Sequence, residues 1–175
     1  YNCFFSSIRN NGCFAAETSL LMGDAGWTID FAALEKTLAD PRVKVLLFCS
    51  PHNPVGRVWT ADEIRRTAQI AHQAGVLFVC DEIHGEFVFG GNRYLPSAQV
   101  EGVDPLRTVI LTSPTKTFNL AGAGIAAIIA ADPKVRAKID RAINDNECCD
   151  VNVFGVAADI AAWNQGEEWL EALLS

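Results

Sequence analysis

The residues of this sequence that could do chemistry together are gathered in three short polar segments. Each segment directly follows a run of apolar residues. The first offers an amide, the second an acid and an imidazole, and the third a hydroxyl and an amine. These side chains are Asn53; Asp81 and His84; and Ser113 and Lys116. An amine that can form an imine, combined with an acid and hydrogen-bond donors, is suited to binding an aldehyde cofactor.

One such cofactor fits these groups, pyridoxal 5′-phosphate (PLP). It needs a lysine to form an imine, an acid beside its pyridine nitrogen, and donors for its phenolic oxygen and its phosphate. Asp81 stands at the end of an apolar run, where burying its charge without a cation would be costly. A protonated pyridine nitrogen supplies that cation. We therefore predict that Lys116 and Asp81 bind PLP, and we expect no metal ion in the site.

The apolar runs before these segments predict the elements that position them. The runs show almost no polar alternation, as strands covered on both faces require. Between them lie helical patterns, one of which opens on a capping box formed by Thr60 and Glu63. The predicted strands are Val43–Cys49, Val76–Cys80, Thr108–Thr112 and Gly124–Ala130, and the predicted helices follow Asp30, Thr60 and Asp132 and cover Val153–Trp163. This alternation predicts an α/β fold with a mainly parallel sheet, in which ligands bind beyond the carboxyl ends of the strands.

The three polar segments also resemble a known family. Asn53-Pro-Val-Gly56, Asp81-Glu-Ile-His84 and Ser113-Pro-Thr-Lys116-Thr-Phe-Asn-Leu-Ala-Gly are similar, in this order, to the signature of the class I/II aminotransferase superfamily (fold-type I PLP enzymes). The resemblance implies a three-layer α/β/α architecture. It also implies that residues 1–175 are part of the large PLP-binding domain, without its N-terminal part and without the C-terminal small domain. The start at Tyr1 without Met, and the end at Ser175 within a helical pattern, agree with that expectation of a truncated chain.

The resemblance assigns a role to each site residue. Lys116 resembles the lysine that binds PLP covalently and moves the Cα proton of the substrate. Asp81 resembles the partner of the pyridine nitrogen, and Asn53 the donor to the phenolic oxygen. Ser113 is similar to a phosphate ligand, and Tyr1 to the aromatic residue that stacks on the pyridine ring. An ordinary turn serine is the alternative for Ser113, and a turn or helix cap is the alternative for Asp81.

Two positions depart from the usual family pattern. His84 stands where typical aminotransferases have a tyrosine, and Gly124 stands where they often have an arginine that contacts phosphate. His84 is either a cofactor contact or a hydrogen-bonded structural histidine. The sequence from Pro51 to Trp59, followed by Asp-Glu-Ile-His, resembles the cystathionine β-lyase (MalY/PatB-type C–S lyase) branch. This resemblance implies β-elimination from cystathionine or related cysteine S-conjugates, with thiol, pyruvate and ammonia as products.

Other functions remain open from the sequence. An aminotransferase would use the same residues and return the proton to the cofactor. Some relatives in the lyase branch also restrain a transcription activator, so a regulatory binding protein is a second alternative. An inactive fragment is the third. Two further charged residues have structural interpretations, Glu82 as support behind the site and Arg57 as a member of an ion pair.

Composition excludes several classes of function. A net charge of −7, without a cluster of Lys and Arg, argues against nucleic-acid binding. The six cysteines form no CxxC pair, which favours a reduced, cytoplasmic setting over disulfides or a zinc site. The longest apolar stretch, Leu120 to Ala131, is too short to cross a membrane. The family resemblance implies an amino-acid substrate and a homodimer.

Overall fold

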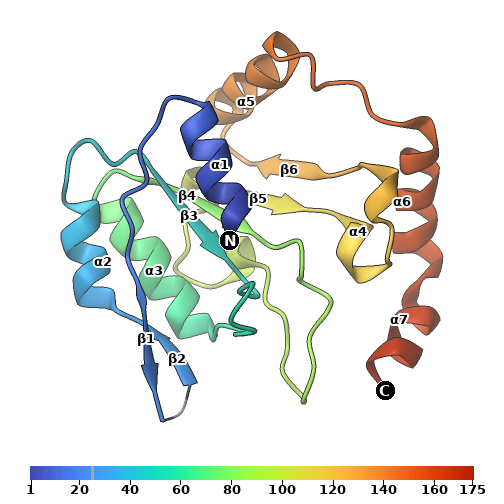
Figure 1. Cartoon of the computed structure of the whole chain (residues 1–175), viewed down its shortest axis with the longest axis horizontal. Helices are drawn as coiled ribbons and strands as arrows, with labels where there is room; N and C mark the ends of the chain where they lie inside the picture. Colours follow the sequence, from blue (N-terminus) through green and yellow to red (C-terminus); the bar gives the residue numbers. More distant parts are fainter. Residues whose placement is uncertain (25) are drawn as a thin grey trace.

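A four-stranded sheet forms the centre of the structure (Figure 1). The computed structural model describes residues 1–24 and 26–175. The strand order is β3-β4-β5-β6, in which β3 (Val45–Cys49), β4 (Leu77–Asp81) and β5 (Thr108–Thr112) are parallel to one another. β6 (Ala127–Ala130) pairs antiparallel with β5. The predicted α/β fold with a mainly parallel sheet is therefore confirmed.

The last strand differs from the sequence expectation in its surroundings. Near-complete burial on both faces was expected for all four strands. In β6, however, Ile128 is 43% exposed and Ile129 is 54% exposed, and these neighbours point to opposite faces. Only Ala130 is buried, at the end where α5 (Pro133–Asp145) packs against the strand. The apolar sequence of β6 is therefore not matched by burial within the described residues.

Two helices cover one face of the sheet. They are α2 (Phe31–Leu38), capped by the Asp30 side chain, and α3 (Ala61–Gln73), which opens on the predicted Thr60–Glu63 capping box. Their apolar sides meet the side chains of alternate strand residues, which point to this face. The resulting core contains Leu34, Leu38, Phe48, Ile64, Ala68, Ala71, Phe78, Cys80 and Ile110. This packing fixes the positions of the strands, and with them the ends at which the polar segments begin.

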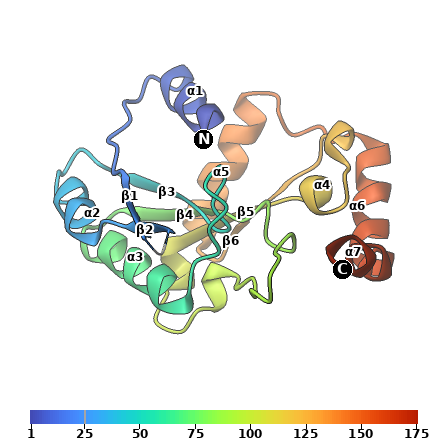
Figure 2. The ribbon, with the colours of Figure 1, turned by 60° about the horizontal axis from the view of Figure 1, so that its bottom comes forward.

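Further elements lie on the other side of the sheet and beside its end. Figure 2 shows α1 (Asn2–Asn10) on the opposite side of the sheet from α2 and α3. A short helix, α4 (Pro114–Thr117), follows β5. α6 (Val153–Gln165) packs beside it, and α7 (Glu167–Leu174) packs against α6. A hairpin of β1 (Leu20–Gly23) and β2 (Gly26–Ile29) was not expected from the sequence. No helix in the described part of the chain is long and apolar enough to cross a membrane.

Candidate active site

The three polar segments meet at one edge of the sheet. In the register, Cys49 pairs with Asp81 and Asp81 pairs with Leu111, so the three parallel strands end side by side. The backbone N–H of Ser50 donates to the carbonyl oxygen of Asp81 at 3.0 Å, and that of Glu82 donates to Leu111 at 2.8 Å. These bonds join the turns just past the strands. The structure therefore brings Asn53, Asp81, His84, Ser113 and Lys116 to the edge where the sequence predicted a site.

Asp81 is the last residue of β4 and its carboxylate is partly buried. Burial raises its pKa above the usual 3.8, while the Ile83 N–H and the nearby His84 pull the pKa down. The Ile83 N–H donates to Asp81 Oδ1 at 3.1 Å. No lysine or arginine of the described residues forms an ion pair with this carboxylate. A partly desolvated acid without a cation fits the pyridine nitrogen of PLP, which would bring a positive charge.

His84 lies within electrostatic reach of both Asp81 and Lys116. Burial lowers the pKa of its imidazole, the carboxylate of Asp81 opposes that shift, and the charge of Lys116 adds to it. The net effect is a pKa below the usual 6.5, which favours the neutral imidazole. A neutral ring does not compete with a cofactor for the negative charge of Asp81. Whether His84 contacts the cofactor stays a prediction.

Lys116 lies on α4, a helix whose other residues hold it in place. Ser113 caps the helix and Pro114 occupies its first position. Pro114, Thr115 and Thr117 are buried, whereas Lys116 is exposed. In the part of the chain that the structure describes, no acidic group pairs with the Lys116 amine. A fixed backbone with a free amine suits a lysine that must reach a cofactor.

Ser113 is almost completely buried and its hydroxyl is already engaged. Oγ donates to the carbonyl oxygen of Ile125 at 2.6 Å and accepts the N–H of Thr115 at 3.1 Å. The hydroxyl of Thr115 lies 2.7 Å away. These contacts explain the local role of Ser113 as a helix cap. Its expected role as a phosphate ligand stays a prediction.

Two more positions singled out by the family resemblance are Tyr1 and Gly124. Tyr1 precedes α1, and its pKa is raised by Cys3 first and, among smaller causes, by the negative charge of Asp81. Its ring makes an edge-to-face contact with Phe4, with centroids 5.6 Å apart.

Gly124 has φ of 59°. An arginine at this position would be strained, so the departure from the family pattern agrees with the local backbone.

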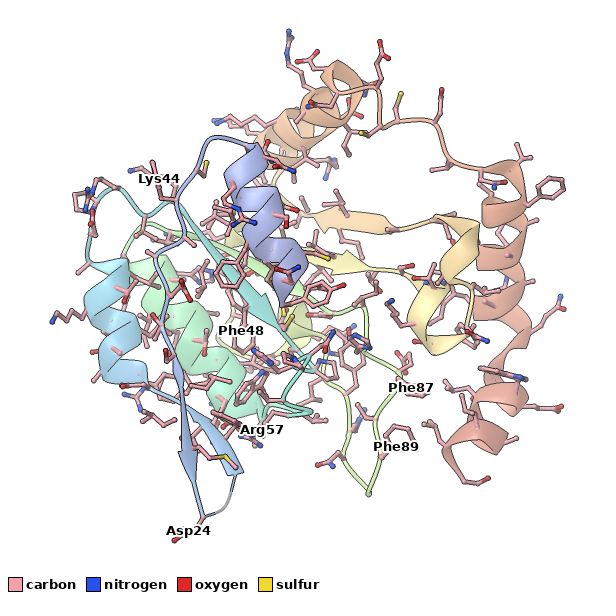
Figure 3. All side chains as sticks on the ribbon, in the orientation of Figure 1. Asp24, Lys44, Phe48, Arg57, Phe87 and Phe89 are labelled. Carbon is pink, nitrogen blue, oxygen red and sulfur yellow. The ribbon has the colours of Figure 1, made fainter. Side chains whose placement is uncertain are left out.

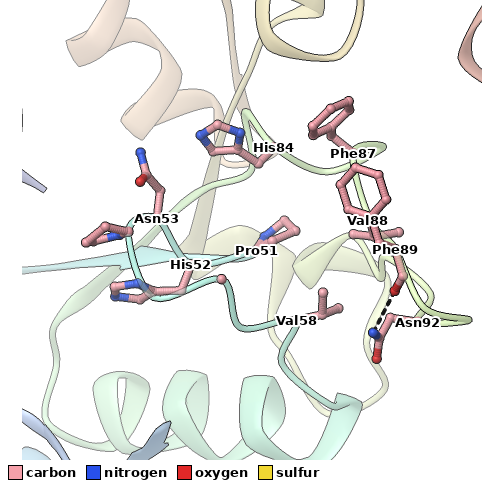
Figure 4. A pocket seen from close by; sticks show the side chains of 11 residues that line it. Pro51, His52, Asn53, Val58, His84, Phe87, Val88, Phe89 and Asn92 are labelled. Carbon is pink, nitrogen blue, oxygen red and sulfur yellow. Dashed lines mark hydrogen bonds between the residues drawn. The ribbon is translucent and has the colours of Figure 1, made fainter. Parts of the chain in front are cut away.

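A cavity of about 350 Å³ opens beside Asn53 and His84 (Figure 4). One wall is the turn after β3, and the other is the loop after β4, which Figure 3 shows with Phe87 and Phe89 labelled. The lining residues are Pro51, His52, Asn53, Pro54, Gly56, Val58, His84, Phe87, Val88, Phe89 and Asn92. The sequence reasoning missed Phe87 and Phe89, because a loop has no periodicity that marks its apolar residues. Their place directly after the His84 motif was the available signal.

The two charged residues interpreted as structural have structural contacts. Glu82 is 2% exposed, and its carboxylate accepts hydrogen bonds from the Tyr94 hydroxyl and from the N–H of Ser97 at 2.8 Å. The Ser97 hydroxyl donates to it as well. Arg57 donates to Glu63 at 2.5 Å and to the carbonyl oxygen of Trp27 at 2.8 Å. Glu82 therefore ties the long loop to the end of β4, next to Asp81.

We expect Glu82→Ala to destabilise the protein by about 3 kcal/mol, because it leaves the partly buried hydroxyl of Tyr94 and the buried donors of Ser97 without an acceptor. Urea unfolding monitored by circular dichroism measures this loss. Glu86→Ala is the matched control, since Glu86 is exposed on the same loop, and we expect a change within about 0.5 kcal/mol. Equal losses in the two variants would show that the buried hydrogen bonds do not stabilise the loop.

Comparison with known proteins decides the family. A family model described as aminotransferase class I and II matches residues 7–163. The chain belongs to this family. The resemblance read from the three motifs is thus confirmed.

Among the described residues there is no group of three or more His, Cys, Asp or Glu side chains that could hold a metal ion.

Two curated relatives match this aminotransferase-family chain over nearly its whole length, and one of them is named as a lyase. It is 34% identical to cystathionine beta-lyase PatB of Bacillus subtilis, over 100% of this chain and 45% of that protein. It is also 34% identical to protein MalY of Escherichia coli, over 99% of this chain and 44% of that protein. The chain therefore spans less than half the length of these relatives.

Two solved structures share the fold of this chain, and one of them contains the cofactor. Cystalysin from Treponema denticola, which contains PLP, superposes with a TM-score of 0.94 at 34% identity, over 98% of this chain and 44% of that chain. N-succinyldiaminopimelate aminotransferase from Mycobacterium tuberculosis superposes with a TM-score of 0.89 at 28% identity, over 99% of this chain and 44% of that chain. PLP is the cofactor of this family. Lyases and aminotransferases share the fold, so the fold alone does not choose the reaction.

Proposed function

We propose that the protein is a PLP-dependent C–S β-lyase that acts on cystathionine or related cysteine S-conjugates. The observation that supports the lyase over other reactions is the 34% identity to cystathionine beta-lyase PatB across the whole chain. The site supports the cofactor, since an amide meets an acid and a lysine at one sheet edge, and neither of these two charged groups has an ion-pair partner among the described residues. The proposal extends to a homodimer, as the family resemblance implies, and to a cytoplasmic setting, which the cysteine pattern favours.

Six residues would hold PLP in this proposal. Lys116 would bind its aldehyde carbon covalently, and Asp81 would face its pyridine nitrogen. Asn53 would donate to its phenolic oxygen, and His84 would contact the cofactor beside Asp81. Ser113 would contact its phosphate, and Tyr1 would lie against its ring. PLP, when bound, supplies an electron sink for the negative charge that develops at the substrate Cα.

The protein's own groups then move the protons. Once the substrate is bound, the Lys116 amine would be free to act as a base. Lys116 Nζ would take the Cα proton, and the electron pair left at Cα would break the bond between Cβ and sulfur. The negative charge of Asp81 would keep the pyridine nitrogen protonated. The Lys116 ammonium would give its proton to the departing sulfur, which would leave as a thiol, and water would hydrolyse the released enamine to pyruvate and ammonia.

Product analysis of the full-length protein tests the reaction. We expect cystathionine to give pyruvate, ammonia and free thiol in equal amounts without any keto-acid acceptor. Pyruvate is measured with lactate dehydrogenase and the thiol with a chromogenic disulfide. Turnover that depends on a keto acid and releases no thiol would contradict the lyase proposal.

That second outcome would identify an aminotransferase, the alternative that the structural likeness to N-succinyldiaminopimelate aminotransferase favours. The same groups serve both reactions, because both begin with removal of the Cα proton by Lys116. They differ in where the proton and electrons go next. An amino-donor screen with a keto-acid acceptor separates the two reactions in one assay.

A further inference from the structure

The cavity of about 350 Å³ lies directly next to the proposed cofactor site. Asn53 and His84 belong to both, so a substrate held there would extend from the reacting atoms into the cavity. Its volume falls in the range of small-molecule sites. The reacting bond of a β-lyase substrate joins Cβ to sulfur, and whatever is attached to the sulfur must be accommodated nearby.

The wall formed by the loop after β4 is aromatic, and two contacts lie within the loop itself. The rings of Phe87 and Phe89 pack edge to face, with centroids 5.0 Å apart and planes at 82°. The side-chain amide of Asn92 donates to the carbonyl oxygen of Phe89 at 2.7 Å, which closes the loop on itself (Figure 4). Phe89 is nevertheless 53% exposed. An exposed aromatic ring beside a cavity is typical of a binding surface.

The cavity offers no charge to a polar ligand. None of its lining residues is a Lys, Arg, Asp or Glu in the described part of the chain. Burial lowers the pKa of both lining histidines, His52 and His84, below the usual 6.5 and so favours their uncharged forms. A carboxylate that entered this space would lose its hydration without gaining a cationic partner. An apolar group would lose nothing and would gain contact with the rings.

We propose that this cavity receives the substituent on the substrate sulfur and selects apolar, uncharged groups such as benzyl or alkyl. This inference rests on the proposed lyase function and names its substrate class. Cysteine S-conjugates with apolar leaving thiols are then better substrates than cystathionine, whose leaving group ends in a charged amino acid. Phe89 acts as a specificity-determining residue, and Lys116 and Asp81 act equally on all substrates.

Selectivity of the full-length holoenzyme is the first test. We compare kcat/KM for S-benzylcysteine, S-methylcysteine and cystathionine in the natural protein, in Phe89→Ala and in Phe14→Ala. Phe14 is the matched control, because it is a fully exposed phenylalanine outside the cavity. We expect the natural protein to prefer S-benzylcysteine over S-methylcysteine by about tenfold or more. In Phe89→Ala we expect this preference to fall about tenfold, while kcat/KM for S-methylcysteine changes by less than about twofold. In Phe14→Ala we expect the preference to be unchanged.

Binding without turnover gives an independent readout. Norvaline and phenylnorvaline have the chains of S-methylcysteine and S-benzylcysteine with a methylene in place of sulfur, so neither can be cleaved. By calorimetry, we expect phenylnorvaline to bind the natural holoenzyme about tenfold more tightly than norvaline, and to lose that advantage in Phe89→Ala.

Two results would overturn the inference. In the first, Phe89→Ala lowers kcat/KM equally for S-benzylcysteine and S-methylcysteine, weakens binding equally for phenylnorvaline and norvaline, and lowers the melting temperature. That result would show that the cavity packs against another part of the protein. A natural preference for cystathionine would show that the space accepts charge. Failure of the proposed function looks different: transamination without thiol release, while phenylnorvaline still binds better than norvaline, refutes the lyase and retains the apolar cavity.

Discussion

Replacement of Lys116 by alanine is expected to abolish covalent attachment of PLP and to lower turnover about a thousandfold or more. The amine is the group that forms the imine with the aldehyde and then removes the Cα proton, so its loss removes two functions at once. Because Lys116 is exposed, we expect the variant to remain as stable as the natural protein. Borohydride reduction of the full-length holoenzyme followed by peptide mapping should find the pyridoxyl group on Lys116.

Lys134→Ala is the control for this experiment, since Lys134 is an exposed lysine on α5, away from the sheet edge. It should retain the reducible PLP absorbance, the labelled Lys116 peptide and full turnover. A labelled lysine elsewhere in the natural protein, or turnover that survives Lys116→Ala, would remove Lys116 from the site. The test does not depend on whether the reaction is elimination or transamination.

Asp81→Asn is expected to change function and stability in opposite directions. With PLP bound, loss of the negative charge beside the pyridine nitrogen should lower turnover about a hundredfold. Without PLP, the same change removes a partly buried carboxylate that has no cationic partner among the described residues. The cofactor-free variant should therefore melt higher than the natural protein, by about 2 °C.

The pH dependence of this stability difference follows from the direction of the pKa shift. Burial raises the pKa of Asp81 in the folded state above 3.8. Above the folded-state pKa the charged carboxylate costs stability, and below 3.8 it is protonated in both states and costs nothing. The advantage of Asp81→Asn should thus be complete at neutral pH and vanish as the pH falls through that window. Melting curves of both cofactor-free proteins between neutral and acidic pH measure it.

A constant difference across this pH range, or a lower melting temperature for the variant at neutral pH, would show that Asp81 has a stabilising partner in the cofactor-free protein. Asp62→Asn is a suitable control, because Asp62 is exposed on α3. We expect it to alter neither turnover nor the difference between cofactor-free and PLP-bound melting temperatures.

The sequence by itself determined the elements that position the site. Apolar runs followed by polar turns indicated β3, β4 and β5, and the Thr60–Glu63 capping box marked the start of α3. These signals are local, since a strand end or a helix cap depends on residues a few positions apart. Parallel strands then bring their carboxyl ends together, which is why Asp81 and Lys116 could be placed at one edge without coordinates.

Only the tertiary structure decided what surrounds those residues. It engaged the Ser113 hydroxyl with the carbonyl of Ile125, joined Glu82 to Tyr94 and Ser97, and left Ile128 and Ile129 of β6 exposed. It also set the Phe87–Phe89 loop opposite the turn after β3 to form a cavity. Each of these features depends on which segments come into contact and which do not, and the separation of these segments along the chain follows no repeating pattern. Such contacts are fixed by the packing of the whole chain, because close packing determines which side chains meet.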